Sequence, residues 1–286
     1  MTGANGKPAG QSEVTSDLDG CAVMEFFGGG QGRSLSAYDR ASVSWSQDYV
    51  DHQGLTLRLR GRVLDGTMRM EDSIRTLAGG MRLRSRFAWS MDSASMEVRQ
   101  IWWLSTDGGS TEPVNFDGRY RKHPDYRPPA PPPAAVCRDR PGYRALDGML
   151  GTWRVLFNET EVGRATLAAT TGGCLIEESY IGDPSARDPR YRLTAFLYYD
   201  RYIDTWYRVQ TDTHGRFHRL GGSVTDGALR VAGVITGLEE KPVNGTLVWR
   251  VESPDTLSQV WSVAVPPDHA ERAPQFTLRW VRVPTP

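Results

Sequence analysis

The chain of 286 residues has no excess charge of either sign, because 34 lysine and arginine residues balance 34 aspartate and glutamate residues. A protein without a net field does not attract nucleic acid or an anionic membrane over long range. No run of about 18 apolar residues, the length of a membrane-spanning helix, is present, and the amino terminus has no signal-peptide core. We therefore expect a soluble, cytoplasmic protein whose partners include neither nucleic acid nor a membrane.

Cysteine is scarce, and the three cysteines, Cys21, Cys137 and Cys174, are an odd number without metal-type spacing. This pattern argues against a disulfide framework and against a zinc site, so we expect reduced thiols. The sequence also has no Gly-x-Ser-x-Gly motif, no phosphate-binding glycine loop and no histidine and aspartate cluster with metal spacing. We therefore expect neither a metal nor a cofactor.

Helical periodicity is missing beyond Arg144–Leu150, whereas alternation of apolar and polar residues is common. Met81–Met91 alternates at every position, as a half-buried strand does. Similar segments, separated by Asp-Gly, Asn-Gly and related turn signals, are Leu55–Val63, Thr246–Ser253 and Phe276–Val283. The pattern predicts an all-β chain of antiparallel strands. Because the chain has no net charge, we interpret the arginines on the outward strand faces as a solvated sheet face. They are Arg58, Arg60, Arg82, Arg84 and Arg86.

The chain contains an internal repeat. When the sequence is shifted by 161 positions, Tyr38–Arg69 aligns with Tyr199–Arg230 without a gap, and 13 of the 32 pairs are identical. Between the copies lies a segment with seven prolines, which favours an extended connector and cannot join the interior of a sheet. We predict an N-terminal domain over residues 1–122, a linker over 123–142 and a C-terminal domain over 143–286.

The second copy has one element more than the first. Leu146–Val162 is typical of a short helical turn followed by a strand, and nothing before Gly10 matches it. Loss of that strand would leave an exposed sheet edge, so we expect a domain contact, a homodimer contact or a local rearrangement there. Because closing a sheet removes its edges, the simplest architecture is two up-and-down barrels of roughly eight to nine strands, the first without its opening strand.

The first copy carries several recognisable sequence motifs. They are the Trp-x-Gln-x-x-x-Asp-x-x-Gly run of Trp45–Gly54, LRLRGRVLDGTM from Leu57, VRQIWWLSTDGG from Val98 and FDGRYR from Phe116. With these motifs, repeated more loosely in the second copy, the chain resembles the bacterial DUF1579 family. The resemblance implies lipocalin-like, calycin-type barrels, a fold that serves carriers and cofactor-free enzymes alike.

The second copy also begins with Gly151-Thr152-Trp153, which is similar to the Gly-x-Trp that opens lipocalin barrels. The resemblance implies that Trp153 closes one end of the barrel and that Arg279, from the last strand, packs across it.

Polar residues share strand faces with tryptophans, which we take to mark the barrel interior. An aromatic cup with a carboxylate and with amide or guanidinium donors is the usual composition of a small-molecule pocket, but the same residues would also fill a packed barrel. In the first copy the candidates are Glu25, Trp45, Gln47, Tyr49, Gln100 and Trp102. In the second they are Glu178, Tyr198, Trp206, Arg208, Gln210, Trp249, Gln259 and Trp261.

Three functions stay open. The first is binding of a hydrophobic or aromatic small molecule, as in secondary metabolism. The second is a cofactor-independent isomerase, cyclase or lyase that uses Glu178 with Arg208 or His218 as acid and base, since a Glu buried beside apolar neighbours has a raised pKa. The third is a structural or interaction module with filled barrels. The second copy is richer in aromatic residues, so if only one barrel is functional we expect it to be the second, with the first as a scaffold or lid.

Overall fold

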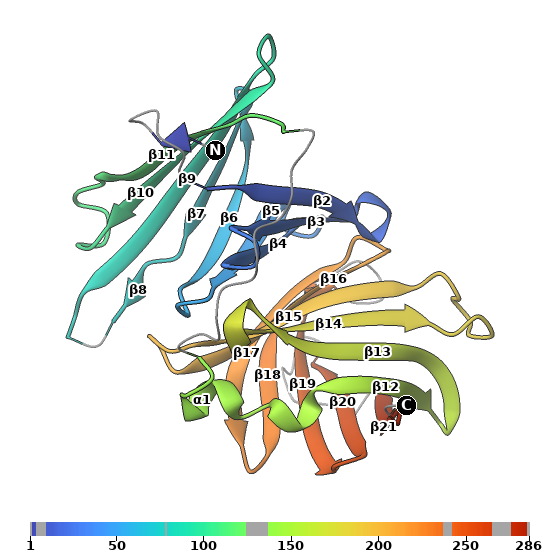
Figure 1. Cartoon of the computed structure of the whole chain (residues 1–286). Helices are drawn as coiled ribbons and strands as arrows, with labels where there is room; N and C mark the ends of the chain where they lie inside the picture. The colour runs from blue at the N-terminus through green and yellow to red at the C-terminus, as the bar shows by residue number, and fades with distance from the viewer. Residues whose placement is uncertain are drawn as a thin grey trace.

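The computed structural model describes residues 2–3, 10–77, 79–123, 137–236, 242–264 and 276–284. The chain is all-β, as predicted, and forms two sheets (Figure 1). The alternating segments occur as strands close to their expected bounds; Met81–Met91, for example, corresponds to Arg82–Asp92. Most of the predicted linker, residues 124–136, lies outside the described residues.

The first sheet is a curled, open half-barrel of antiparallel strands. Its order is β1-β11-β10-β9-β7-β6-β5-β4-β3-β2, with β8 paired to β9 beside this path. The strands are β1 (Thr2–Gly3), β2 (Ser12–Asp17), β3 (Ala22–Phe27), β4 (Gly32–Asp39), β5 (Ser44–Asp51), β6 (Thr56–Leu64), β7 (Thr67–Asp72), β8 (Arg75–Thr76), β9 (Arg82–Asp92), β10 (Glu97–Ser105) and β11 (Val114–Tyr120).

The second sheet is a closed barrel of ten strands, rather than the expected eight to nine. The short helix α1 (Pro141–Arg144) and the turn η2 (Asp147–Met149) precede it. The strands are β12 (Gly151–Phe157), β13 (Thr160–Thr170), β14 (Leu175–Gly182), β15 (Arg192–Asp200), β16 (Thr205–Asp212), β17 (Phe217–Thr225), β18 (Ala228–Thr236), β19 (Pro242–Ser253), β20 (Thr256–Ala264) and β21 (Phe276–Arg282).

Strand β12 explains why one sheet closes and the other does not. It pairs with β13 on one side and β21 on the other, so that the barrel has no free edge. In the first sheet the two-residue strand β1 stands where β12 stands in the second, and within the described residues no strand of the length of β12 precedes β2. Strand β1 pairs with β11 as β12 pairs with β21, but its described residues do not pair with β2, so the sheet stays open. The expected rearrangement is therefore local and small.

Trp153 is packed in the barrel core next to the turn η2. Its indole is fully buried and its Nε1 donates a hydrogen bond of 2.9 Å to the carbonyl of Met149. The expectation for Arg279 is wrong, because Arg282 is the residue over the indole, 4.1 Å from the ring centroid. Strand residues alternate between faces, so Arg279 points outward and pairs with Glu159.

The two copies pack through equivalent outer faces. Strands β3 to β6 of the first sheet lie against β14 to β17 of the second (Figure 1). One apolar cluster spans both copies and includes Leu35 and Val50 from the first and Phe196, Tyr198 and Val209 from the second. At its edge, Gly54 adopts a positive φ of +77°, and an added Cβ there would be 2.3 Å from the Tyr143 hydroxyl. The hairpin between β5 and β6 therefore reaches α1 only with glycine at this position.

Buried ion pairs cross this interface from equivalent positions. The repeat aligns Arg58 with Arg219, and each of these arginines binds a carboxylate of the other copy. Arg58 Nη1 lies 2.6 Å from Asp200, and Arg219 binds Asp48, which also accepts a 2.6 Å hydrogen bond from the Tyr198 hydroxyl. Both carboxylates are fully buried, and a buried carboxylate is costly without such partners.

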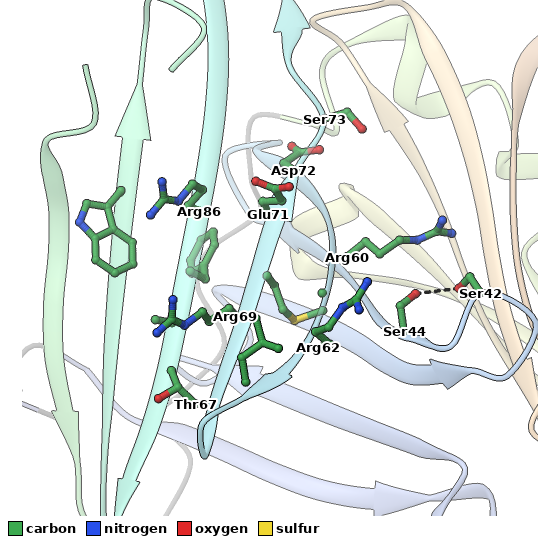
Figure 2. Close-up of a pocket in the computed structure, with 16 residues that line it drawn as sticks. Ser42, Ser44, Arg60, Arg62, Thr67, Arg69, Glu71, Asp72, Ser73 and Arg86 are labelled. Carbon is green, nitrogen blue, oxygen red and sulfur yellow. Dashed lines mark hydrogen bonds between the residues drawn. The ribbon is translucent and has the colours of Figure 1, made fainter. Parts of the chain in front are cut away.

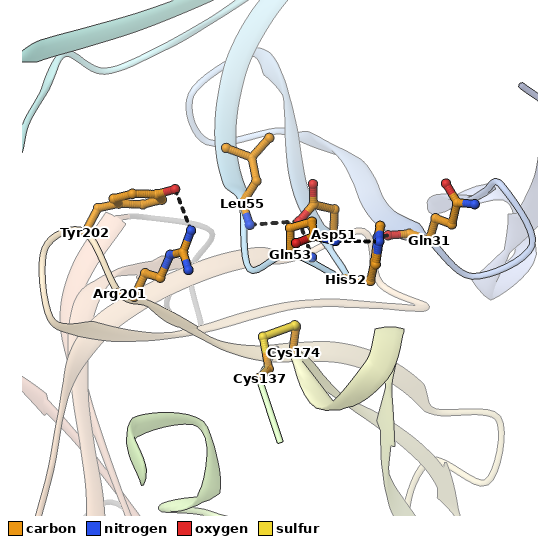
Figure 3. The surroundings of a disulfide bond; sticks show 9 residues. All are labelled: Gln31, Asp51, His52, Gln53, Leu55, Cys137, Cys174, Arg201 and Tyr202. Atoms are coloured by element: carbon orange, nitrogen blue, oxygen red, sulfur yellow. Dashed lines mark hydrogen bonds between the residues drawn. A yellow bond between two sulfur atoms is a disulfide. The ribbon is translucent and has the colours of Figure 1, made fainter. Parts of the chain in front are cut away.

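The expectation of reduced thiols is wrong for two of the three cysteines. Cys137 and Cys174 form a disulfide with their Cα atoms 5.1 Å apart, next to the β5–β6 hairpin of the first copy (Figure 3). Their separation of 37 residues gives no recognisable spacing, and only the fold brings the end of the linker to the turn between β13 and β14. Cys21, which the repeat aligns with Cys174, is free.

Candidate functional site

The interior of the second barrel contains a cavity of about 600 Å³. Inward-facing residues of β14, β16 and β17 form one side, and those of β20 and β21 form another. The lining combines aromatic and aliphatic side chains with a few polar groups, as small-molecule sites usually do. Its aromatic members are Tyr180, Tyr191, Trp261, Phe276 and Trp280, and its polar members are Glu178, Arg208, Gln210, Asp212, Arg216, His218 and Gln259.

A buried ion pair lies in the wall of this cavity. Arg208 donates to Glu178 Oε2 through Nη2 at 2.6 Å and through Nε at 3.2 Å, and both residues are about 2% exposed. The two strands are not neighbours, because β15 runs between them. At the crossing point β15 carries the small residue Ala195, over which the longer side chains meet. The arginine also donates to Gln210, the next inward residue of β16.

His218 extends this network toward one unpaired atom. Gln210 and His218 are directly paired across β16 and β17, and their side chains lie 3.2 Å apart between Nε2 and Nδ1. The Nε2 atom of His218 has no hydrogen-bond partner among the described residues. Burial lowers the pKa of His218 to about 4, partly opposed by the charge of Asp212, so the imidazole is neutral at pH 7.

The charged residues near the hairpin between β16 and β17 are also paired. Asp212 accepts hydrogen bonds from the backbone of His214 at 2.9 Å and of Arg216 at 3.1 Å, the turn-capping role typical of Asp at such positions. The Arg216 side chain returns to the same carboxylate at 2.7 Å. Tyr191 donates to Asp212, and burial, followed by the charge of Asp212, raises the pKa of Tyr191.

The structure brings most of the predicted residues of the second copy to this cavity. Trp206 and Trp249 instead belong to the packed core of the barrel, where the ring centroids of Trp249 and Trp280 are 4.8 Å apart. The prediction that Tyr198 lines the pocket is wrong, because its side chain points outward into the interface between the copies. The predicted residues that do line the cavity are Glu178, Arg208, Gln210, His218, Gln259 and Trp261.

Sequence reasoning missed several lining residues of the second barrel. Phe276, Leu278 and Trp280 alternate along β21 and all face the cavity. The alternation of Phe276–Val283 already placed them on one face, but the face was not assigned to the interior.

The concave side of the first sheet carries a smaller cavity of about 330 Å³. Trp45 does not line it, and packs edge-on against Tyr38 with ring centroids 5.8 Å apart. The residues missed by sequence reasoning include Trp89, Asn115 and Tyr120. The predicted residues that line this cavity are Glu25, Gln47, Tyr49, Gln100 and Trp102.

A broad depression on the first sheet involves arginines of its outward face. Figure 2 shows these side chains projecting from β6, β7 and β9: Arg60, Arg62, Arg69 and Arg86. Arg86 is neutralised by Glu112, and Arg60 lies 3.9 Å from Asp39. More than half of the Arg60 side chain is exposed, which fits the solvated sheet face that we expect. Arg58 departs from that expectation, because it is buried in the interface between the copies.

Neither a metal site nor a membrane-spanning helix is evident in the described part of the chain. It contains no group of three or more histidine, cysteine, aspartate or glutamate side chains arranged to hold a metal ion. Its helices are too short and too polar to cross a lipid bilayer.

Comparison with known proteins identifies no family. No family model matches the sequence, so the DUF1579 resemblance stays a hypothesis, and no curated protein matches either. A solved structure of a protein of unknown function from the DUF3598 family of Nostoc punctiforme is 11% identical, with 96% of this chain and 94% of that chain covered and a TM-score of 0.21. At that TM-score the likeness carries no argument about function.

Proposed function

We propose that the second barrel binds an uncharged, hydrophobic or aromatic small molecule that carries a hydroxyl or carbonyl group. The observation that supports this most is the unpartnered Nε2 of the neutral His218 in a cavity lined largely by aromatic and aliphatic side chains. A buried polar atom without a partner costs free energy, which a ligand hydrogen bond would recover. The volume of about 600 Å³ lies within the usual range for such sites.

The charges around the cavity favour a ligand without net charge. Glu178 is paired with Arg208, and Asp212 with Arg216. A charged ligand would have to break one of these pairs or remain uncompensated inside the barrel. The DUF1579 and lipocalin resemblance supports the proposal only through the fold, which also hosts enzymes. Because the cavity is not filled by side chains, the reading as a filled structural barrel is disfavoured.

The test uses the neutral fluorescent dye N-phenyl-1-naphthylamine and its displacement by 2-naphthol from the full chain. Trp261→Leu, which removes an aromatic wall, should weaken dye binding, while Trp102→Leu in the other cavity should not. His218→Phe should lower the affinity for 2-naphthol by about threefold to tenfold, the net value of one hydrogen bond, and leave the dye affinity unchanged. Absence of dye binding, or equal effects of the two tryptophan variants, would refute the proposal.

A second candidate is a cofactor-independent isomerase, cyclase or lyase. The observation in its favour is again His218: the Gln210 amide nitrogen donates to Nδ1, so the neutral imidazole carries its proton on Nε2, which is a free N–H donor in the cavity and a candidate general acid. Glu178 is a weaker candidate than the sequence implied, because two N–H groups of Arg208 hold its carboxylate. Any compound released from denatured protein would be identified by mass spectrometry and returned to the folded chain. An enzyme would convert it, and His218→Phe would abolish turnover while binding persists; binding without turnover would exclude this candidate.

A further inference from the structure

The concave cavity of the first sheet has a wall of nearly parallel aromatic rings. Phe87 lies between Trp89 and Trp102, with ring centroids 5.3 Å from each and interplanar angles of 11° and 15°. Phe87 and Trp102 are directly paired across β9 and β10, so the pleat of the sheet sets this arrangement. The electron-rich faces of such rings attract cations, and tryptophan does so most strongly.

Glu25 of β3 brings a carboxyl group to the same cavity. Its described hydrogen-bond partners are the hydroxyls of Ser12 at 2.5 Å and Ser34 at 3.4 Å, and neither is a cation. Burial raises the pKa of Glu25. A cation next to this carboxyl would stabilise its ionised form and offset the cost of burial.

The other groups of this cavity also favour a positive ligand. Asp51 is the second acid of the lining, but it is engaged by the backbone amides of Gln53 and Leu55 at 2.8 Å. Burial and then the charges of Asp51 and Glu25 raise the pKa of Tyr49. None of the described lining residues of this cavity is lysine, arginine or histidine. The second barrel differs, since its acids are paired with arginines.

From these observations we propose that the first sheet holds a separate binding site for a small organic ammonium ion. The ammonium group lies at the Glu25 carboxylate, and the organic part lies against Phe87, Trp89 and Trp102. Gln47 uses its amide nitrogen on Ser34 at 3.1 Å, which leaves its Oε1 as a further acceptor for an ammonium N–H. This site is independent of the cavity in the second barrel, so the chain carries two sites with different charge preferences.

Three probes with one phenyl ring and different charges test the proposal: 2-phenylethylammonium, 2-phenylethanol and phenylacetate. Each is titrated into the full chain at pH 7 by calorimetry or ligand-observed NMR. We expect the ammonium ion to bind most tightly and phenylacetate most weakly. The proposal is overturned if phenylacetate binds as well as the ammonium ion, or if the ammonium ion does not bind at millimolar concentration. It is also overturned if the alcohol binds as tightly as the ammonium ion and this binding is weakened by Trp102→Leu but not by Trp261→Leu.

Two substitutions separate the charge from the aromatic wall. Glu25→Gln keeps the shape of the side chain. It should lower the affinity for the ammonium ion at least tenfold and leave the affinity for the alcohol unchanged. Glu13→Gln makes the same change at an exposed position of the adjacent strand β2 and should change neither. Trp102→Leu should weaken binding of the ammonium ion. Trp261→Leu in the second barrel should leave binding of the ammonium ion unchanged and should weaken binding of the alcohol, an uncharged aromatic ligand of the kind proposed for that barrel. Unaltered ammonium affinity in folded Glu25→Gln protein, verified by thermal unfolding, would also overturn the proposal.

Discussion

Asp48 gives the sharpest test of how the two copies are held together. The substitution Asp48→Asn preserves the volume of the side chain but removes the charge that Arg219 and the Tyr198 hydroxyl contact. Asp48 is fully buried and the Arg219 side chain is 18% exposed, so the guanidinium would be left largely buried without a counter-charge. Breaking a buried ion pair in this way costs about 3–5 kcal/mol, and the partial exposure of Arg219 favours the lower end.

The assay is thermal unfolding of the full chain, followed by circular dichroism and calorimetry. A loss of about 3 kcal/mol would lower Tm by roughly 5 °C if the 286 residues unfold together. The matched control is Asp117→Asn, which breaks an equally bidentate pair with Arg99, a side chain that is 44% exposed. Exposed pairs contribute less than about 1 kcal/mol.

Replacing the whole polar group around Asp48 by apolar side chains is a second test of the buried ion pair. The repeat aligns Asp48 with Val209, so valine already occupies this position in the second copy. The triple variant Asp48→Val, Tyr198→Phe, Arg219→Met removes the whole polar group and should recover most of the stability that Asp48→Asn loses. If Asp48→Asn and Asp117→Asn lower Tm equally, the inference that this ion pair is buried between the copies is refuted.

Three further predictions concern the second barrel and its linker. The pKa of His218 is about 4 in the folded chain against an ordinary value of 6.5, so the unfolded chain binds the proton first as the pH falls. The free energy of unfolding should therefore fall by up to about 3 kcal/mol between pH 6.5 and pH 4. Urea titrations of His218→Gln should lack this pH dependence. Reducing the Cys137–Cys174 bond, which spans 37 residues, should cost about 3–4 kcal/mol, measured as a lower Tm with dithiothreitol and no such effect in the double Cys→Ala variant. Arg282→Ala should destabilise the barrel by about 1.5–3 kcal/mol because it exposes Trp153 and frees the carbonyl of Leu150, whereas Arg279→Ala on the outer face should have little effect on unfolding.

Each of these predictions has a result that contradicts it. A pH dependence unchanged in His218→Gln would mean that other groups carry it. Equal Tm values with and without reductant would mean that the cysteines are not bonded. Equal effects of the Arg282 and Arg279 substitutions would mean that the guanidinium over Trp153 does not stabilise the barrel.

The sequence predicted those parts of the fold that depend on local periodicity. Alternation gave the strands, and Asp-Gly and Asn-Gly gave the turns, because side-chain direction along a strand is a local property. The same alternation predicted that Gln47 and Arg208 point inward, and both line cavities as expected. The difference between the openings of the two sheets followed from comparison of the two copies, because nothing before Gly10 matches Leu146–Val162.

The errors arise where distant segments meet. Ala195–Tyr199 is apolar on both faces because one face lines the barrel and the other lies in the interface, so alternation could not place Tyr198. The disulfide depends on where the linker ends in space. The choice between Arg279 and Arg282 depends on the register of β21 against β12, where Arg282 pairs with Trp153.

The interface between equivalent faces also explains why the two copies were able to diverge. A two-fold-like contact is complete with two units, so it closes rather than growing into a polymer. On a single chain the second unit is present at an effective concentration on the order of millimolar, so even weak complementarity keeps the faces together. Selection for identical halves is then relaxed, and the position that holds Asp48 in one copy holds Val209 in the other. Tandem linkage thus leaves each copy free to change the side chains that line its own cavity.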